Sequence, residues 1–221
     1  MLDGLSNLCD DYCKKLVAVG CDGASVMLGK NTGAVQRIRK HTDRPWLLGV
    51  HCSGHKLELA YKNMVKSKIS LYDKVENFLL SVYYFYRNSN LNRAMLKESF
   101  KSLGINVVLP TRVGGTRWIS HLKLAVGCYL KGYKAISQHL SQLQNPDDRV
   151  YATEKGNKAK ALSKTVFARD AWHMMHFLLD CLEILVIVSK KFQERTATVS
   201  EILHDIESSE KQLEKLKTRL R

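Results

Sequence analysis

Residues 13–22 read Cys-Lys-Lys-Leu-Val-Ala-Val-Gly-Cys-Asp, a short apolar run with charge on one side and a Gly-Ala-Ser turn at residues 23–25 on the other. A run of this length, bounded in this way, is typical of a buried β-strand. A second run of strand length, Trp46 to Cys52, follows Pro45, and Ser53-Gly54 then interrupts it. We therefore expect two short strands within the first 55 residues.

The segment between these strands has the periodicity of a helix. From Ala24 onward the apolar residues recur with a period close to 3.6, which predicts a helix. The glycines between Gly29 and Gly33 predict a break in that helix. Asp22 or Ser25 is available as its N-cap. Strand, helix and strand in this order predict parallel pairing through a right-handed crossover.

The rest of the chain is predicted to be helical. Apolar residues recur at intervals of three and four from Leu71 to Tyr86, the mark of one buried helix face. Residues 150–164 are polar and rich in lysine, which favours a loose connector. The fold class is thus α/β plus all-α, with a strand-helix-strand unit in residues 1–68 and a helical region in residues 69–221. Beyond Tyr86, further helices are expected at about 118–144, 166–192 and 199–220.

Charge and composition restrict the partners. The 221 residues carry 35 Lys and Arg against 21 Asp and Glu, a net charge of +14, which favours polyanions such as nucleic acid. Residues 30–68 alone hold nine Lys and Arg against two acids, a net charge of +7. The longest apolar run, Phe177 to Val188, is shorter than the roughly 20 residues that span a bilayer, so no membrane partner is expected. Six cysteines fit reduced thiols in the cytosol or nucleus.

Asp22 is the first candidate functional residue. It follows an apolar strand, at the place where open α/β sheets present ligands beyond the carboxyl ends of their strands. A metal ion or a phosphate would be met there, but catalytic divalent ions need several oxygen ligands. The alternative is that Asp22 only caps the following helix.

Cys52 and His55 form the second candidate, because their spacing at a strand-to-helix turn is one that zinc sites use. Zinc needs four ligands, which Cys9 and Cys13 would complete if the fold brought them close. Ordinary core residues are the alternative, and a Cys-His nucleophile pair lacks a third, orienting group. No metal site is therefore assigned, and zinc stays an alternative.

Five residues are candidates for nucleic-acid contacts. Arg37, Arg39 and Lys40 lie in the basic stretch and are predicted to contact phosphates. Arg117 and Trp118 follow a Gly-Gly turn, so a cation for phosphate stands beside an aromatic ring that can stack on a base. A Trp at such a place also fits a core residue that fills the junction between the two regions.

Three motifs in this order resemble the hAT transposase superfamily, especially its domesticated, zinc-finger-associated relatives. They are Cys-Asp-Gly-Ala-Ser-Val-Met at 21–27, Val-His-Cys-Ser-Gly-His-Lys-Leu-Glu-Leu-Ala at 50–60, and Thr-Arg-Trp at 116–118. The order and spacing of the three are specific and cover residues 13 to about 140. The helical remainder matches only in character.

The resemblance implies a ribonuclease-H-like core split by a long helical insertion, with two aspartates and one glutamate holding Mg²⁺ or Mn²⁺. Asp22 matches the second acidic position, Cys52 and His55 match the Cys-x-x-His element, and Trp118 matches the aromatic that attends a flipped base. The resemblance places the other two acids, and a dimerisation region for self-association, outside residues 1–221.

We expect from this a nuclear, transposase-derived module that binds nucleic acid, DNA in the first place, or a protein. With Asp22 as one acid of three, this chain is not expected to be an enzyme by itself and needs no firm cofactor. Two alternatives stay open: part of an active, metal-dependent DNA transposase, or a zinc-dependent scaffold or ligase.

Overall fold

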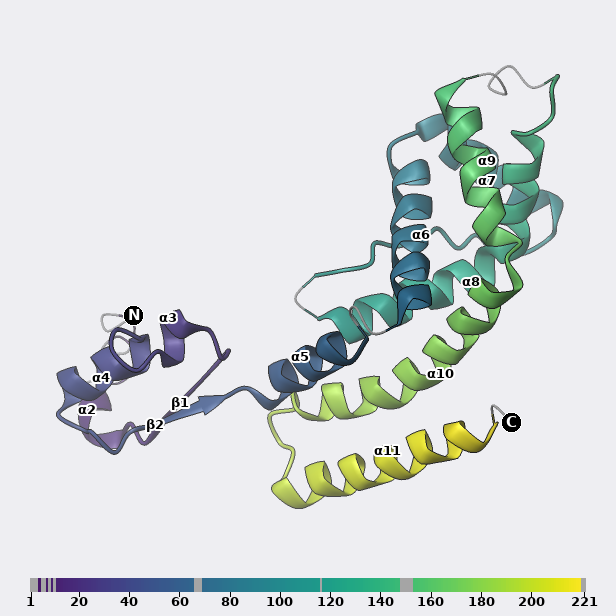
Figure 1. Cartoon of the computed structure of the whole chain (residues 1–221). Helices are drawn as coiled ribbons and strands as arrows, with labels where there is room; N and C mark the ends of the chain where they lie inside the picture. The colour runs from purple at the N-terminus through teal and green to yellow at the C-terminus, as the bar shows by residue number, and fades with distance from the viewer. Residues whose placement is uncertain are drawn as a thin grey trace. The chain divides into compact units, whose positions relative to one another are not determined.

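The computed structural model describes residues 11–65, 69–115, 117–147 and 153–219, together with residues 4, 7 and 9. The chain divides into two compact units, Met1–Ala60 and Tyr61–Arg221. The division falls within helix α5 (Ser53–Val65), whereas the sequence analysis placed it after residue 68. The two units are described separately below (Figure 1).

The first unit is built around a two-stranded parallel sheet. Strand β1 (Ala18–Cys21) pairs with β2 (Leu48–His51), and the register aligns Ala18 with Leu48 and Cys21 with His51. This confirms the predicted strand-helix-strand order and the parallel pairing. The connecting helix is interrupted near Gly29–Gly33, as expected. Short helix α2 (Tyr12–Lys15) precedes β1, and α3 (Ser25–Leu28) and α4 (Ala34–Thr42) lie between the strands.

Helix α4 covers one side of this sheet. Val35 and Ile38 lie one turn apart on the helix and are buried with Leu47, 3%, 2% and 0% exposed respectively. Burial of these three side chains holds the helix against the strands by the hydrophobic effect. Four partly buried residues complete the cluster: Leu16, Val19, Cys21 and Leu28.

The other side of the sheet is open, which corrects the expectation of buried strands. Leu48 and Val50 alternate with the core-facing Gly49 and are 57% and 49% exposed. Parallel strands are normally covered on both faces. Among the described residues of this unit, helices cover only the side that carries Val19 and Cys21, so the strands are half-exposed.

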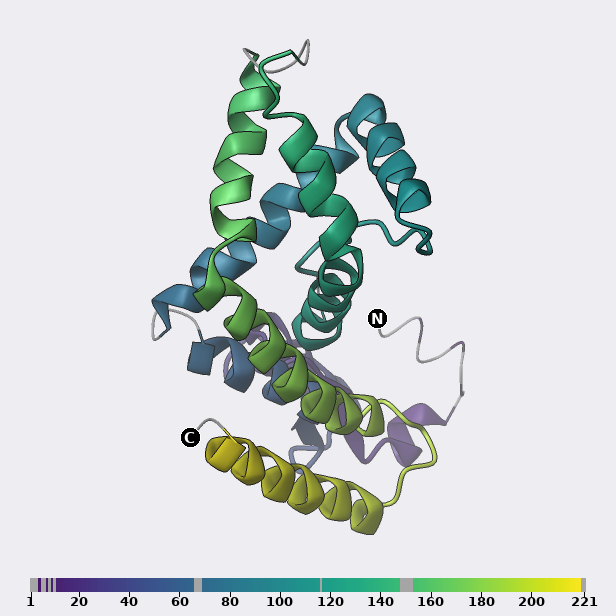
Figure 2. The ribbon, with the colours of Figure 1, turned by 90° about the vertical axis from the view of Figure 1, so that its right-hand side faces the viewer.

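The second unit is all-helical. Its most extensive packing joins α10 to α8 and to α11; α7 and α9 each pack against both α8 and α6, and α6 also packs against α10. Two views show α10 and α11 side by side along their lengths (Figures 1 and 2). The helices are α6 (Ser70–Arg87), α7 (Asn90–Ser102), α8 (Trp118–Gln142), α9 (Glu154–Val166), α10 (Arg169–Lys191) and α11 (Val199–Arg219).

Helix α6 has the buried face that its periodicity predicts. Val75, Phe78 and Val82 are at most 4% exposed and follow one another at intervals of three and four. The ring of Phe78 meets that of Tyr129 on α8 edge to face, with centroids 5.2 Å apart. The helical prediction for this region is therefore confirmed.

Residues 150–164 were wrongly interpreted as a connector, because 154–166 form helix α9. The backbone N–H of Gly156 donates to the hydroxyl of Thr153 at 3.4 Å, which caps the helix. Ala159, Leu162 and Val166 are at most 8% exposed and make a narrow apolar face between lysines. The predicted residues 150–152 lie outside the described part of the chain.

Helix α10 is apolar enough to be compared with a membrane span. Its best 18-residue window has a mean hydropathy of 1.6, and α10 alone meets this criterion in the part of the chain that the structure describes. However, 44% of that window is buried inside the protein, and a core helix passes the same test. This one helix does not indicate a membrane protein.

Candidate functional site

The carboxyl ends of β1 and β2 bring the first candidate residues together. Asp22 follows β1, His51 ends β2, and the N–H of Cys52 donates to the carbonyl of Cys21 at 2.8 Å, so the ladder extends one residue past the strands. The turn after Asp22 lies close against His51. A Cβ built on Gly23 would be 2.2 Å from Cε1 of that imidazole, so only glycine fits this approach without displacing the ring.

Asp22 is exposed and is not the N-cap of the next helix. The N-cap of α3 is Ala24, which makes no side-chain capping bond, and Ser25 is already helical. One carboxylate oxygen of Asp22 accepts the N–H of Ala24 at 3.4 Å, a long hydrogen bond within the turn. The carboxylate therefore has solvent-facing lone pairs, and the expected capping role is reduced to this one turn contact.

The described residues contain no group of three or more His, Cys, Asp or Glu side chains placed to hold a metal ion. The zinc set considered from the sequence, Cys9, Cys13, Cys52 and His55, is thus not assembled. Cys9 instead lies 3.9 Å from the ammonium of Lys15, and Cys52 is exposed. The ring of His55 is tilted against that of His51, with centroids 5.7 Å apart.

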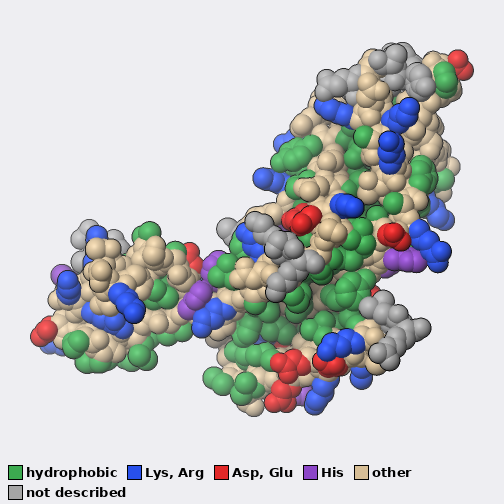
Figure 3. Space-filling view, viewed as in Figure 1, with side chains coloured by type: hydrophobic (Ala, Val, Ile, Leu, Met, Phe, Trp, Pro, Cys, Tyr) green, Lys and Arg blue, Asp and Glu red, His purple; other side chains and the backbone are tan. Residues whose placement is uncertain are grey.

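The three basic residues predicted to contact phosphates all lie on helix α4 but differ in their surroundings. Arg37 and Lys40 are exposed, one turn apart, on the side opposite Val35 and Ile38. They form no hydrogen bond or ion pair through their side chains with the described residues. Figure 3 shows Lys and Arg side chains gathered on the visible face of this unit.

Arg39 behaves differently, because its guanidinium is bound within the protein. Nε and Nη2 both donate to the carbonyl oxygen of Leu47, at 2.8 and 2.7 Å. Arg44 has a comparable role: it donates to the carbonyls of Leu16, at 3.1 Å, and Lys14. These two arginines hold the unit together, so Arg39 is a weaker candidate for phosphate contacts than its neighbours.

In the second unit, Trp118 begins helix α8 and is partly buried. The ammonium of Lys62 lies 4.1 Å from the centroid of its indole, a cation-π distance. One face of the ring is therefore occupied, which weakens the prediction that a base stacks on it. Arg117, the preceding residue, is exposed and available for a phosphate.

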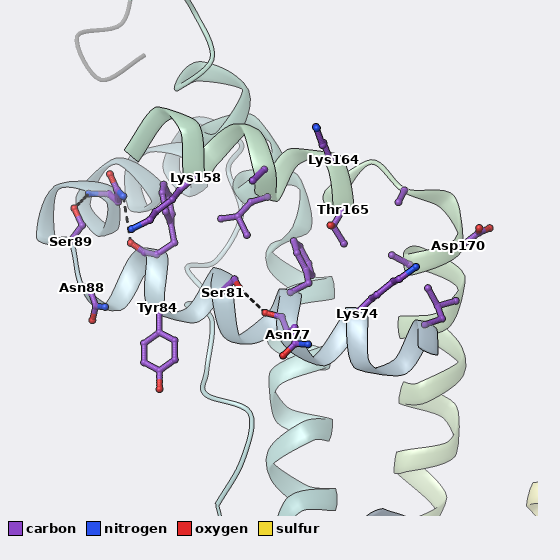
Figure 4. A pocket seen from close by; sticks show the side chains of 18 residues that line it. Lys74, Asn77, Ser81, Tyr84, Asn88, Ser89, Lys158, Lys164, Thr165 and Asp170 are labelled. Carbon is purple, nitrogen blue, oxygen red and sulfur yellow. Dashed lines mark hydrogen bonds between the residues drawn. The ribbon is translucent and has the colours of Figure 1, made fainter. Parts of the chain in front are cut away.

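Sequence reasoning missed a groove of about 1050 Å³ in the second unit, lined by α6, α9 and the beginnings of α7 and α10 (Figure 4). Polar and charged side chains stand at its edge, among them Lys74, Asn77, Asn88 and Lys158. It was missed because residues 150–164 were taken as a connector. The signal that points to α9 is the alternation of Ala159, Leu162 and Val166 with lysines.

Buried tyrosines and Cys181, whose pKa burial raises to about 11, carry the large pKa shifts, and the groove and the strand ends do not. Burial raises the pKa values of Tyr61, Tyr86 and Tyr129 well above the ordinary value, and raises that of Tyr72 to about 12. The hydroxyl of Tyr86 lies 3.1 Å from Nδ1 of the buried His139. These groups belong to the helical core, so their shifts reflect desolvation and mark no reactive site.

Comparison with known proteins adds no identity. No protein-family model matches the chain, and no solved structure matches it.

Proposed function

We propose that this chain is a module of hAT transposase origin that binds DNA through its first unit and performs no strand transfer by itself. The observation that carries the proposal is the pair Arg37 and Lys40, exposed on α4 without an acidic partner among the described residues. Guanidinium and ammonium groups one turn apart are suited to successive phosphates of a nucleic-acid backbone. A nuclear location follows from this partner.

The charge of the first unit supports the same partner. Residues 11–60 hold eight Lys and Arg and four Asp and Glu, a net charge of +4. Arg37 and Lys40 are proposed to act as phosphate contacts, so affinity is proposed to come from the backbone and to vary little with sequence. Such binding weakens steeply as salt rises, because DNA counterions are released on binding.

The proposed lack of catalysis rests on Asp22. Phosphodiester chemistry of this kind uses several carboxylates around divalent ions, and Asp22 is the one acid at the described strand ends. If Mg²⁺ or Mn²⁺ is used by a complete ribonuclease-H-like core, Asp22 supplies one ligand and other residues must supply the rest. The parallel strand-helix-strand unit is compatible with part of such a core.

Charge-reversed variants test the proposal. Binding of the full chain to a fluorescent duplex of about 20 base pairs is measured by anisotropy at several salt concentrations. The double variant Arg37→Glu/Lys40→Glu should make the negative slope of log K against log salt shallower, reducing its magnitude by about 2. The matched control is Lys211→Glu/Lys215→Glu on α11, which changes the net charge equally. Equal weakening by both pairs would mean that overall charge, and not α4, attracts DNA.

A further inference from the structure

The groove of the second unit is long and follows one face of helix α6. The α6 residues that line it are spaced by three and four, from Leu71 through Phe78 to Phe85, and Asn88 continues the line directly after the helix. At about 1.5 Å per residue, this face extends for about 25 Å. A groove of that length is suited to an elongated partner more than to a compact small molecule, which usually occupies a rounder cavity.

The groove is open because small side chains face it from the opposite wall. Ala161 on α9, Ala168 after it and Ala171 on α10 stand where larger residues would fill the space. The walls beneath are apolar: Phe78 and Leu162 are 4% and 8% exposed. Apolar side chains entering between the helices would be removed from water against this surface.

The edge of the groove is positively charged. Lys74 on α6 and Lys158 on α9 extend along it, with Lys164 further outward, and Asp170 is the one acid among its lining residues (Figure 4). Three cations against one acid leave a net charge of +2 around an apolar floor. A complementary partner therefore carries acidic groups at the margins of an apolar stripe.

We propose that this groove binds an amphipathic helix of a partner protein, with its apolar stripe on the floor and its acidic flanks against Lys74 and Lys158. Helices bind in this way through anchors spaced i, i+3, i+4 and i+7. A nucleic-acid strand fits less well, because Phe78 and Phe85 are 4% and 9% exposed and only Tyr84, at 43%, offers a ring for stacking. The proposal does not depend on DNA binding by the first unit.

A designed peptide is the probe for the test. It has about 18 residues, leucines at the helical spacing and glutamates beside them, and carries fluorescein. Two comparison peptides have the same leucines with lysine flanks, and the same composition in scrambled order. Anisotropy with the full chain should show binding of the glutamate peptide at least about tenfold tighter than of either comparison peptide.

Two variants connect that binding to the groove. Ala161→Trp fills the groove, and Lys74→Glu/Lys158→Glu reverses its edge charge. Each should lower the affinity for the glutamate peptide by about tenfold or more. The control Lys131→Glu/Lys160→Glu should leave this affinity unchanged, because both positions are exposed and do not line the groove. Thermal melts confirm that every variant is folded.

The proposal is overturned if the three peptides bind equally, if none binds, or if neither groove variant changes the affinity. It is also overturned if a DNA duplex displaces the glutamate peptide and Lys74→Glu/Lys158→Glu abolishes DNA binding, because the groove would then be a nucleic-acid site. Loss of DNA binding in the Arg37→Glu/Lys40→Glu variant, with peptide binding retained, separates the two proposals.

Discussion

Arg39 donates hydrogen bonds from both Nε and Nη2 to the carbonyl oxygen of Leu47, at 2.8 and 2.7 Å. This pair ties the last turn of α4 to the residue before β2. Because Leu47 is fully buried, water would not readily replace these two donors at its carbonyl. A basic residue in the middle of the most positive stretch of the chain thus contributes to the fold.

Arg39→Lys should destabilise the first unit by about 1–3 kcal/mol, since a lysine ammonium cannot reproduce the two-donor geometry. The substitution keeps the charge, so the net electrostatic attraction of a polyanion is unchanged. Hydrogen exchange of peptides covering β1 and β2 is the measurement. Arg37→Lys is the matched control, and unchanged exchange in Arg39→Lys would show that the Leu47 contact has no net effect on stability.

Gly33→Ala should destabilise the first unit more than Gly20→Ala. A Cβ on Gly33 would lie 2.6 Å from the backbone N and O of Gly29, and backbone atoms cannot turn aside as a side chain can. Gly20 has nothing within 4 Å of its would-be Cβ. We expect a loss of about 1–3 kcal/mol for Gly33→Ala and almost none for Gly20→Ala, measured by the same exchange experiment. Equal effects would contradict the close approach.

The stability of the helical unit should fall as the pH rises from about 10 to about 12. Burial raises the pKa of Tyr72 to about 12, whereas a tyrosine in the unfolded chain ionises near 10. Between these values the unfolded chain binds fewer protons than the folded one, so rising pH favours unfolding. Below pH 10 both states hold the proton and Tyr72 adds no pH dependence. Urea unfolding at several alkaline pH values measures the effect.

Substitutions assign this alkaline effect to its residue. Tyr72→Phe removes one of the buried phenols and should make the decline with pH less steep. Tyr84→Phe is the control, because Tyr84 is 43% exposed and is not part of the buried core. If both variants have the same pH profile as the unsubstituted chain, burial of Tyr72 is not the cause.

Mg²⁺ or Mn²⁺ should leave the melting temperature of the chain unchanged. The reason is the small number of ligands: Asp22 offers one carboxylate, and no other described acid lies at the strand ends with it. Asp22→Ala should cost less than about 1 kcal/mol, because the 3.4 Å contact with Ala24 is long and exposed. A metal-dependent rise in melting temperature that Asp22→Asn abolishes would show a working site within this chain.

The periodicity of apolar residues was sufficient to predict most of the helices and both strands. Val75, Phe78 and Val82 are spaced by three and four, which predicts a helix with one buried face. Two short apolar runs with a helix between them predict two parallel strands, and these strands are present. Burial of the strands was not predictable in the same way. A short apolar strand has the same sequence pattern whether one or both faces of its sheet are covered. In this structure Leu48 and Val50 lie on an uncovered face and are exposed.

The candidate site depended on contacts that sequence patterns do not encode. Arg37 and Arg39 are alike in the sequence, but one faces solvent and the other reaches the carbonyl of Leu47. The groove lies between α6 and α9, which are more than sixty residues apart in the chain, and α9 supplies five of its lining residues. Local sequence patterns do not predict that segments so far apart in the chain come together.

The open side of the sheet makes salt act on this chain in two opposing ways. A net charge of +14 keeps molecules of this chain apart in dilute buffer, and it is also the basis of the proposed attraction to DNA. At about 0.15 M salt the Debye length is about 8 Å, so raising the salt should weaken the proposed DNA binding and at the same time let two molecules approach. Leu48 and Val50, exposed on the open face of the sheet, then favour association, because contact between such faces removes apolar surface from water. Low salt should thus keep the protein from aggregating, whereas high salt should be needed to keep it free of nucleic acid.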